Sequence, residues 1–256
     1  MAKIIAIANQ KGGVGKTTTS INLAASLKAR EQSVLLIDLD PQGSATLGSG
    51  VDKHSLAYST NDVLLHDCTA EQACLSVGNG FDLIPANGDL TVAEVSLMSR
   101  VNREGFLSRA LLPLKNRYDY ILIDCPPALN TLTLNALMAA DSVLIPMQCE
   151  YFAMEGLVAL LSTIEQVQAS INPRLTLEGV LRTMYDARSR LCSEISKQLQ
   201  EHFADKVYRS VIPRNVRLAE APSHGLSALQ YDKNSIGAAA YMVLASELIN
   251  RQEVTV

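Results

Sequence analysis

The chain has 256 residues, of which 48% are hydrophobic and 19% are charged. This composition is typical of a folded globular protein and excludes disordered and collagen-like chains. The formal net charge of −4 gives no overall basic character, so the whole-chain balance alone argues against nucleic acid as a partner. The length suits one large α/β domain, with two small domains as the alternative. We predict a single domain over residues 1–256.

Seven short apolar runs alternate with longer segments, several of them with helical periodicity. The runs are rich in Ile, Val and Leu and do not alternate with polar residues, which is typical of strands buried on both faces. They cover residues 4–8, 34–39, 81–85, 120–123, 143–147, 177–184 and 207–212. Helical periodicity appears in residues 17–30, 131–140 and 154–170, whereas 48–80 is expected to form surface helices and loops. This order predicts an α/β fold with a doubly wound, mostly parallel sheet flanked by helices.

The strongest local pattern follows the first predicted strand, where residues 9–19 read NQKGGVGKTTT. Glycines allow successive backbone N–H groups to point into one concavity, and the next helix adds the positive end of its dipole. The segment therefore predicts a phosphate-binding loop, with Lys16 on the β- and γ-phosphates and the Thr17 hydroxyl on Mg²⁺. The predicted nucleotide ligands in this loop are Lys11, Gly12, Gly13, Val14, Gly15, Lys16, Thr17 and Thr18.

The loop departs from the strict pattern G-x-x-x-x-G-K-[ST], because Gln10 occupies the first glycine position. In exchange, Lys11 precedes the glycine pair, and this K-G-G-x-G-K-T variant is the deviant Walker A motif. In proteins that carry the variant, the additional lysine reaches across a dimer to the nucleotide of the partner. It would act like an arginine finger supplied in trans, neutralising charge on the transferred phosphoryl group.

Aspartates end two further predicted strands. Asp38 and Asp40 fall on the same side of their strand, near its carboxyl end, where open α/β sheets bind ligands. We predict that Asp40 orients the water that attacks the γ-phosphate and that Asp38 supports Mg²⁺ through a water; a plain β-turn is the alternative. Asp124 ends the next such strand in a Walker B arrangement and would hold the Mg²⁺ water shell. The predicted catalytic residues are thus Lys11, Lys16 and Asp40, and the predicted metal site is Thr17, Asp38 and Asp124.

These motifs resemble those of the ParA/Soj family of partition ATPases, within the group that includes MinD and the nitrogenase iron protein. The resemblance covers nearly the whole chain and continues through residues 33–46, 118–127, 132–141, 146–157 and 211–225. The last of these segments is typical of the small chromosomal Soj-like branch. The chain departs from relatives at Ala128 and Asn130, which stand where Ser and Gly are common, in the region that responds to the γ-phosphate.

The resemblance implies a Mg²⁺-dependent ATPase that forms an ATP-bound sandwich dimer and hydrolyses slowly by itself. In that dimer Lys11 contacts the opposite nucleotide, Gly12 must be small, and Glu155 lies near the interface. The adenine is expected near Pro213 and Asn215. A ParB/Spo0J-type protein on centromere-like DNA is the implied partner that stimulates hydrolysis. No helix-turn-helix precedes the first predicted strand, so operator-specific autoregulation is not expected.

Local charge differs from the whole-chain balance. Residues 174–217 hold nine basic and five acidic residues, a balance of +4, which leaves −8 for the rest of the chain. On charge alone a solvated helix face explains this segment equally well. The resemblance favours nonspecific binding of double-stranded DNA and nucleoid association, through contacts that weaken steeply with salt. The predicted DNA-binding residues are Arg188, Arg190, Lys197, Arg209, Arg214 and Arg217.

Three other functions stay open. A MinD-like membrane-associated ATPase would carry a basic amphipathic C-terminal helix, whereas residues 235–250 are typical of a packed helix. An iron–sulfur reductase needs paired cluster cysteines, and the contexts of Cys125 and Cys149 do not match that need. A relative that positions protein cargo, such as flagella or chemoreceptor arrays, is the third alternative. Chromosome, plasmid and protein-complex cargoes are all compatible with the sequence.

Cysteine usage and the first residues favour a cytoplasmic protein with no membrane association. No C-x-x-C pair occurs, so a zinc ribbon and a thioredoxin-type motif are excluded, and reduced structural thiols are expected. The N-terminus lacks a signal-peptide apolar region of usual length, and no apolar run is long enough to span a bilayer. The five cysteines are Cys68, Cys74, Cys125, Cys149 and Cys192.

Overall fold

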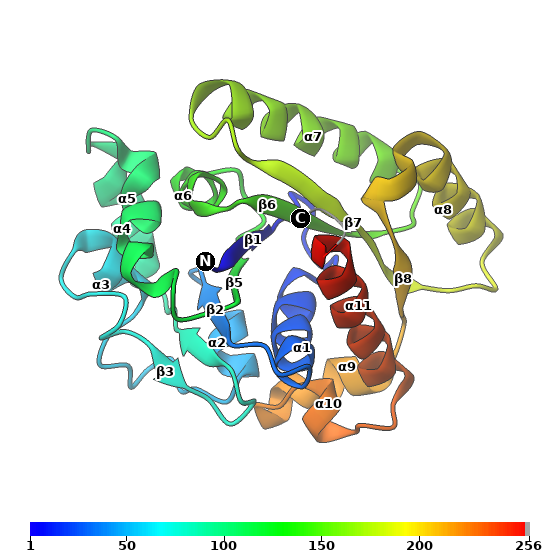
Figure 1. Cartoon of the computed structure of the whole chain (residues 1–256), viewed down its shortest axis with the longest axis horizontal. Helices are drawn as coiled ribbons and strands as arrows, with labels where there is room; N and C mark the ends of the chain where they lie inside the picture. The colour runs from blue at the N-terminus through cyan, green and yellow to red at the C-terminus, as the bar shows by residue number, and fades with distance from the viewer. Residues whose placement is uncertain (254–256) are drawn as a thin grey trace.

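The protein is built around one eight-stranded sheet, seen in a computed structural model that describes residues 1–253 (Figure 1). The strand order is β3-β4-β2-β5-β1-β6-β7-β8, and every pair is parallel except β3 with β4. The strands are β1 (Lys3–Ile7), β2 (Val34–Asp38), β3 (Leu75–Ser76), β4 (Asp82–Ile84), β5 (Tyr120–Asp124), β6 (Ser142–Gln148), β7 (Thr176–Tyr185) and β8 (Val207–Pro213).

Helices cover both faces of this sheet. In Figure 1, α1 and α11 lie on one side, and α6 and α7 lie on the other. The helices are α1 (Lys16–Lys28), α2 (Ser44–Gly48), α3 (Thr60–Leu65), α4 (Leu90–Met98), α5 (Phe106–Ala110), α6 (Thr131–Ala139), α7 (Ala153–Ser170), α8 (Arg190–Phe203), α9 (Val216–Glu220), α10 (Ala228–Tyr231) and α11 (Ile236–Glu253). Short 3-10 turns are η1 (Arg103–Gly105), η2 (Leu112–Leu114), η3 (Ala204–Lys206) and η4 (Ala221–His224).

The central strands are apolar throughout because the side chains of each strand pack into two hydrophobic cores, one on each face of the sheet. In β1, Ile4 faces the core shared with α6 and α7, whereas the next residue, Ile5, faces the core shared with α1 and α11. Leu35 and Leu36 of β2 divide in the same way. Alternate side chains of a strand point to opposite faces, so a sheet covered on both sides needs apolar residues at every position. The predicted doubly wound, mostly parallel sheet is confirmed.

All seven predicted strands are present, and the structure adds one that the pattern did not reveal. The additional strand, β3, has only two exposed residues and pairs antiparallel with β4 at the sheet edge. It lies in the region 48–80 that was expected to form surface helices and loops, where α3 also buries Val63 and Leu64. The expected packed C-terminal helix is confirmed as α11, which contacts α1 and β8. No helix among residues 1–253 is long and apolar enough to cross a bilayer.

Two glycines let the segment after α9 pack closely on the end of α2. Gly50 and Gly225 have positive φ angles of 83° and 68°, in the left-handed region that favours glycine. A Cβ on Gly225 would lie 2.5 Å from the Cα of Gly50, so neither position accepts a side chain without movement of the backbone. This crossing joins the C-terminal part of the chain to the segment that follows α2.

A glutamate of α11 binds the backbone of the edge strand β8. The Oε1 atom of Glu247 accepts a hydrogen bond from the N–H of Arg209 at 2.8 Å, and Oε2 accepts from the N–H of Ser210 at 2.8 Å. Burial opposes ionisation of Glu247, but the hydrogen bonds from Ser210 and Arg209 outweigh it and hold the pKa below its ordinary value. The ionised carboxylate therefore ties the C-terminal helix to the sheet.

We expect Glu247→Ala to lower the free energy of unfolding by about 2–3 kcal/mol, because two backbone N–H groups lose their acceptor. Since the folded-state pKa is lowered, this stabilisation is present above the ordinary pKa of 4.5 and is lost as the pH falls through the folded value. Urea unfolding near neutral and at acid pH measures both effects. Glu165→Ala, on an exposed position of α7, is the matched control. Equal stability of the two variants at neutral pH would contradict this role of Glu247.

Candidate nucleotide-binding site

The loop between β1 and α1 opens toward the space beyond the carboxyl ends of the parallel strands. Gly13 and Gly15 have φ angles of 74° and 88°, which curl the backbone and place Gly15 at the start of α1. A Cβ built on Gly12 or Gly13 would meet no atom within 4 Å, so this part of the loop borders open space. A glycine-rich turn before a 13-residue helix supplies convergent N–H groups and a positive dipole end. This geometry fits a bound phosphate chain.

Lys16 places a buried cation at this loop. The residue is 7% exposed, and its Nζ donates to the carbonyl oxygen of Lys11 at 3.2 Å. Burial lowers the pKa of Lys16, while the carboxylates of Asp124 and Asp40 oppose that effect. An ammonium has three hydrogens to donate, and this is the one side-chain hydrogen bond that Lys16 makes within residues 1–253. The remaining hydrogens of the Lys16 ammonium are available to bind an anionic ligand at the loop.

Asp124 lies behind the loop, fully buried at the end of β5. Its Oδ2 accepts a hydrogen bond from the Thr17 hydroxyl and its Oδ1 accepts one from the Ser20 hydroxyl, both at 2.8 Å. Burial raises the pKa of Asp124 to about 6, although the hydrogen bonds from Ser20 and Thr17 oppose the shift. A hydroxyl and a carboxylate brought together next to a phosphate loop form an oxygen donor set of the kind that suits Mg²⁺.

Asp38 is the neighbour of Asp124 in the sheet, because the two residues are register partners on β2 and β5. The N–H and hydroxyl of Thr46 both donate to its Oδ2, at 2.8 and 2.7 Å. Burial raises the pKa of Asp38 to about 7, and repulsion from the charge of Asp124 is the second cause of this shift. Two buried carboxylates side by side favour a nearby cation. Because Thr46 binds Oδ2 and the N–H of Asp40 donates to Oδ1 at 3.2 Å, an indirect contact to the metal suits Asp38 better than direct ligation.

Asp40 stands at the rim of the same edge and is partly exposed. Its Oδ1 accepts a hydrogen bond from the N–H of Gln42 at 2.9 Å, which forms the turn after β2. Within residues 1–253 the second carboxylate oxygen makes no hydrogen bond, so its acceptor capacity is free. The turn after β2 therefore uses only one of the two carboxylate oxygens of Asp40.

Strands β6 and β7 brace the loop through contacts that the sequence pattern did not reveal. The side-chain amide of Asn9 donates to the carbonyl of Pro146 at 2.8 Å, and that of Gln148 donates to the carbonyl of Gly13 at 3.1 Å. The hydroxyl of Thr183 donates to the carbonyl of Val14 at 2.7 Å. These bonds join groups between 135 and 169 residues apart. Local sequence carries no signal for such long-range partners, whereas the loop itself is a local pattern.

Lys11, Gly12 and Glu155, the residues predicted for a dimer interface, are all exposed, and we call the surface around Lys11 and the connection before α7 the rim. Lys11 and Glu150 form an ion pair of 2.5 Å, with both side chains 49% exposed. Glu155 is exposed in the first turn of α7. Between them, Tyr151 and Phe152 are 75% and 71% exposed and form an edge-to-face aromatic pair. Exposed large aromatic side chains beside a charged pair are typical of a protein contact surface.

Pro213 and Asn215 lie at the carboxyl end of β8, the same edge of the sheet to which the loop belongs. Asn215 caps α9, where its side-chain oxygen accepts a hydrogen bond from the N–H of Arg217 at 3.1 Å. Among the described residues, neither residue forms a hydrogen bond with the phosphate loop. Their position relative to an adenine therefore stays a prediction.

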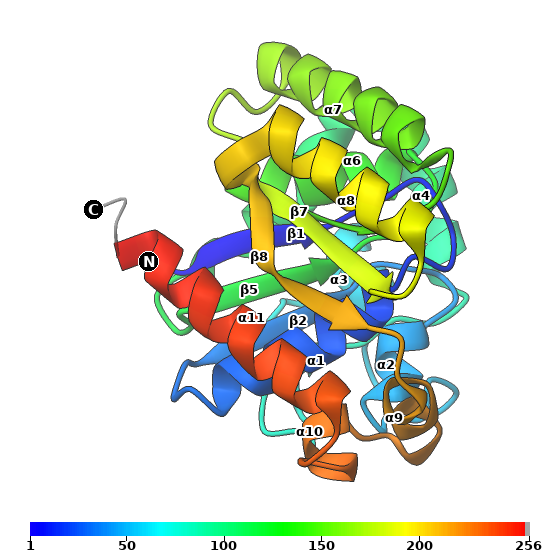
Figure 2. The same ribbon diagram turned by 90° about the vertical axis from the view of Figure 1, so that its right-hand side faces the viewer.

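The predicted DNA-binding residues are all exposed, but most are paired with acids of the same chain. Ion pairs join Arg188 to Asp186, Arg190 to Glu194, Lys197 to Glu201, and Arg217 to both Glu220 and Asp232. The side chains of Arg209 and Arg214 form no ion pair within the part of the chain that the structure describes. Figure 2 shows α8 and α9 toward opposite ends of β8, so these basic residues are spread along one edge of the sheet.

Of the two departures near the end of β5, Asn130 has a local structural explanation, whereas the contact of Ala128 uses only its backbone. Asn130 caps α6, and its side-chain oxygen accepts a hydrogen bond from the N–H of Thr133 at 3.1 Å. The carbonyl of Ala128 accepts a hydrogen bond from the Thr133 hydroxyl at 2.6 Å. Cys125, just before them, is buried, and burial raises the pKa of its thiol, which fits a packing residue rather than a reactive thiolate.

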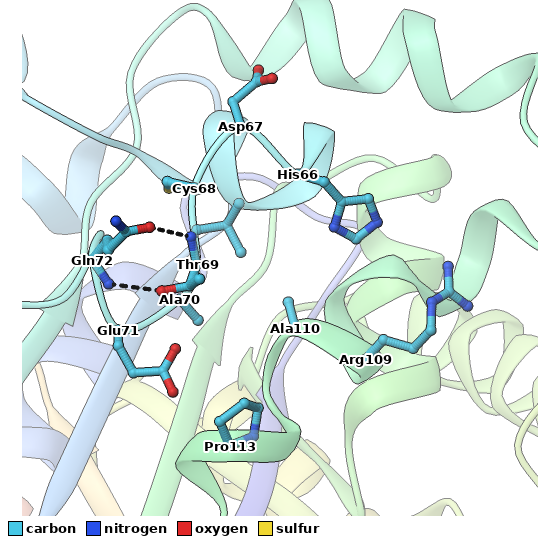
Figure 3. A pocket seen from close by; sticks show the side chains of 11 residues that line it. His66, Asp67, Cys68, Thr69, Ala70, Glu71, Gln72, Arg109, Ala110 and Pro113 are labelled. Atoms are coloured by element: carbon cyan, nitrogen blue, oxygen red, sulfur yellow. Dashed lines mark hydrogen bonds between the residues drawn. The ribbon is translucent and has the colours of Figure 1, made fainter.

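A separate hollow of about 590 Å³ lies between the end of α3 and the segment from α5 to η2 (Figure 3). Thr69 and Gln72 line it and are hydrogen-bonded to each other. The guanidinium of Arg109 lies 4.7 Å from the centre of the Phe106 ring. None of the residues of the phosphate loop lines this hollow, so it is distinct from the candidate site at the loop.

Comparison with known proteins gives the family. A family model described as an AAA domain matches residues 2–177. Soj of Bacillus subtilis is 51% identical over 97% of this chain and 98% of its own length. ParA of Caulobacter vibrioides is 48% identical over 98% and 95%. A solved structure of cobyrinic acid a,c-diamide synthase from Mycobacterium smegmatis, with an ATP analog and magnesium, is 39% identical with a TM-score of 0.87, covering 99% of this chain and 96% of that one. The chain belongs to the ParA/Soj family of partitioning ATPases.

Proposed function

We propose that this protein is a cytoplasmic, nucleoid-associated ATPase that dimerises on ATP, binds double-stranded DNA without sequence preference and drives DNA segregation. The observation that carries the proposal is the convergence of three strand ends on one loop. The buried ammonium of Lys16 and the Thr17–Asp124 pair lie there, with the buried carboxylate of Asp38 beside Asp124. The charge of the partly exposed Asp40 acts on both Lys16 and Asp124. No packing need explains a buried lysine with so few hydrogen-bond partners beside open glycines.

In this proposal each polar group of the site has one task. The loop N–H groups of residues 12–18 and the ammonium of Lys16 bind the phosphate chain of ATP. Thr17 and Asp124 hold the metal and its water shell, and Asp38 supports them from the neighbouring strand. Bound Mg²⁺ would supply charge neutralisation at the phosphate oxygens. Asp40 accepts a hydrogen bond from the attacking water and fixes its orientation.

The second copy would dock on the rim that carries Lys11 and Glu155. Lys11 would then supply a cation to the nucleotide of the other subunit, and Gly12 keeps the approach free because it has no side chain. Pro213 and Asn215 are proposed to lie beside the adenine. A ParB/Spo0J-type partner would raise the rate of hydrolysis. The identity to Soj and ParA proteins supports this part of the proposal.

The packing of α11 argues against the MinD-like alternative of a membrane-targeting C-terminal helix. Tyr241 and Leu248 of α11 are buried against the sheet, and the Tyr241 hydroxyl forms a hydrogen bond of 3.0 Å with Thr19 of α1. A helix whose apolar side is already covered has little left to insert into a bilayer. Binding to lipid vesicles is therefore not expected.

One assay tests the proposal: binding of the protein to nonspecific double-stranded DNA, titrated with salt, with ATP, with ADP and without nucleotide. We expect ATP-dependent binding whose affinity falls steeply as salt rises, because phosphate contacts release counterions. Vesicles of anionic lipid serve as the control surface. Binding that is equal with ADP and ATP, or that favours vesicles over DNA, would contradict the proposal.

We expect Arg217→Glu to weaken ATP-dependent DNA binding at least about tenfold and to reduce the salt slope by about one, because one phosphate contact is replaced by a repulsive charge. The Arg217 side chain reaches Glu220 at 2.7 Å, so the reversal also gathers like charges at this position. Dimerisation on ATP should persist. Arg30→Glu, an exposed charge reversal just past the end of α1, is the control. DNA affinity equal to that of the unmodified protein at physiological salt would exclude Arg217 from the DNA contact.

A further inference from the structure

The two lysines of the phosphate loop have different surroundings. The ammonium of Lys16 is buried and donates to the backbone carbonyl of Lys11. The ammonium of Lys11 lies instead at the exposed rim, where it binds Oε2 of Glu150 at 2.5 Å. Lys16 thus supplies charge inside the loop, whereas the charge of Lys11 is matched by a carboxylate of the same chain.

Backbone contacts on both sides hold this ion pair in place. The N–H of Lys11 donates to the side-chain oxygen of Asn9 at 3.0 Å, and the side-chain amide of Asn9 binds the carbonyl of Pro146. Glu150 follows β6 by two residues, and its carbonyl accepts a hydrogen bond from the N–H of Ala153 at the start of α7. The pair therefore bridges the loop and the β6–α7 connection, 139 residues apart in the chain.

We propose that Glu150 is a positioning residue that holds Lys11 in its own subunit until a second, ATP-bound copy docks. This inference rests on the proposed function, in which Lys11 turns to the nucleotide of the partner. The ammonium would then exchange one carboxylate for the more highly charged phosphate chain. Because both side chains are 49% exposed, water and salt weaken the ion pair, so the release is readily reversible.

Symmetry increases the effect of this contact. In a two-fold dimer each subunit gives up one Lys11–Glu150 pair, so dimerisation breaks two pairs. Removing the carboxylate removes both competing interactions. We expect Glu150→Gln to tighten the ATP-dependent dimer about 2- to 30-fold at low salt, from the usual range for exposed ion pairs counted twice.

Sedimentation velocity with a nonhydrolysable ATP analogue and Mg²⁺ measures the dimer dissociation constant of each full-length variant. The series comprises the unmodified protein, Glu150→Gln, Glu150→Asp and a control, Glu165→Gln. Glu165 is an exposed carboxylate on α7. Each is measured at about 0.05 M and about 0.5 M salt, because screening removes the difference between ion pairs and neutral contacts. Glu150→Asp, which keeps the charge on a shorter side chain, should fall between the unmodified protein and Glu150→Gln.

The expected result is a tighter dimer for Glu150→Gln at low salt, with a ratio to the unmodified protein that approaches one at high salt. A structural effect on folding would not follow salt in this way. An unchanged dissociation constant, or a weaker dimer, would overturn the role of Glu150 while leaving ATP-dependent dimerisation intact. If no variant dimerises with the analogue, the proposed function and this inference both fail. If Glu150→Gln dimerises and the unmodified protein does not, the result supports the inference in its strongest form.

Discussion

Lys16→Ala is expected to lose ATP binding, with an affinity weaker by roughly 100-fold or more, because the phosphate chain loses its buried cation. The ammonium of Lys16 is buried in the loop, where its side-chain hydrogen bond goes to the carbonyl of Lys11. Lys11 cannot take over this task in the same subunit, since its ammonium lies at the rim on Glu150. Isothermal titration calorimetry with ATP and Mg²⁺ measures the effect.

Lys28→Ala is the matched control for this prediction, because it removes an exposed lysine from the last turn of the same helix. Its ATP affinity should equal that of the unmodified protein. Both variants should keep the circular dichroism spectrum of the folded chain. Tight ATP binding by Lys16→Ala would refute the assignment of residues 11–18 as the phosphate loop.

Asp40→Ala should bind ATP and dimerise normally but hydrolyse it roughly 100-fold more slowly or worse, because the attacking water loses the carboxylate that orients it. Only one oxygen of Asp40 is used by the turn after β2, through Gln42. Asp40→Asn keeps an acceptor for that turn and removes the charge, so it separates a catalytic effect from a change in loop conformation. Single-turnover hydrolysis, measured beside ATP binding, gives both quantities.

Slow hydrolysis has a further consequence for this variant. If hydrolysis ends the DNA-bound state, Asp40→Ala should remain on nonspecific DNA much longer than the unmodified protein after excess competitor DNA is added. Asp67→Ala, at an exposed aspartate after α3, is the control. Hydrolysis by Asp40→Ala at the unmodified rate would remove Asp40 from the water-orienting role.

The parts of the site that form one continuous stretch of sequence could be predicted from residue order alone. The phosphate loop and the strands that precede Asp38 and Asp124 each carry their own signal, in glycine spacing or in apolar runs. The supporting contacts could not be predicted in this way. Thr46, for example, binds Asp38 with its N–H and its hydroxyl, but it lies on α2, eight residues beyond it. Its partner becomes identifiable only when the turn between them is known.

The basic residues of the predicted DNA contact could also be predicted only in part, because the sequence gives their positions but not their ion-pair partners. Counting charges separates a basic segment, residues 174–217, from an acidic remainder. The fold then neutralises much of that segment internally, as in the pair of Arg217 with Glu220 and Asp232. Exposed ion pairs of this kind are weak, so a polyanion can compete for the arginine. The count predicts which residues are basic, whereas their availability depends on neighbours that only the structure provides.

The bracing of the phosphate loop by β6 and β7 has a consequence for how the chain matures during synthesis. The loop lies near the N-terminus, but Gln148 and Thr183, which bind its carbonyls, are made much later. Tyr241, which binds α1, is later still. A ribosome therefore releases the loop long before the residues that fix it exist, and contacts of such long sequence separation form slowly. The contacts that brace the loop can thus form only after Gln148 and Thr183 have been synthesised, so the loop is fixed late in folding.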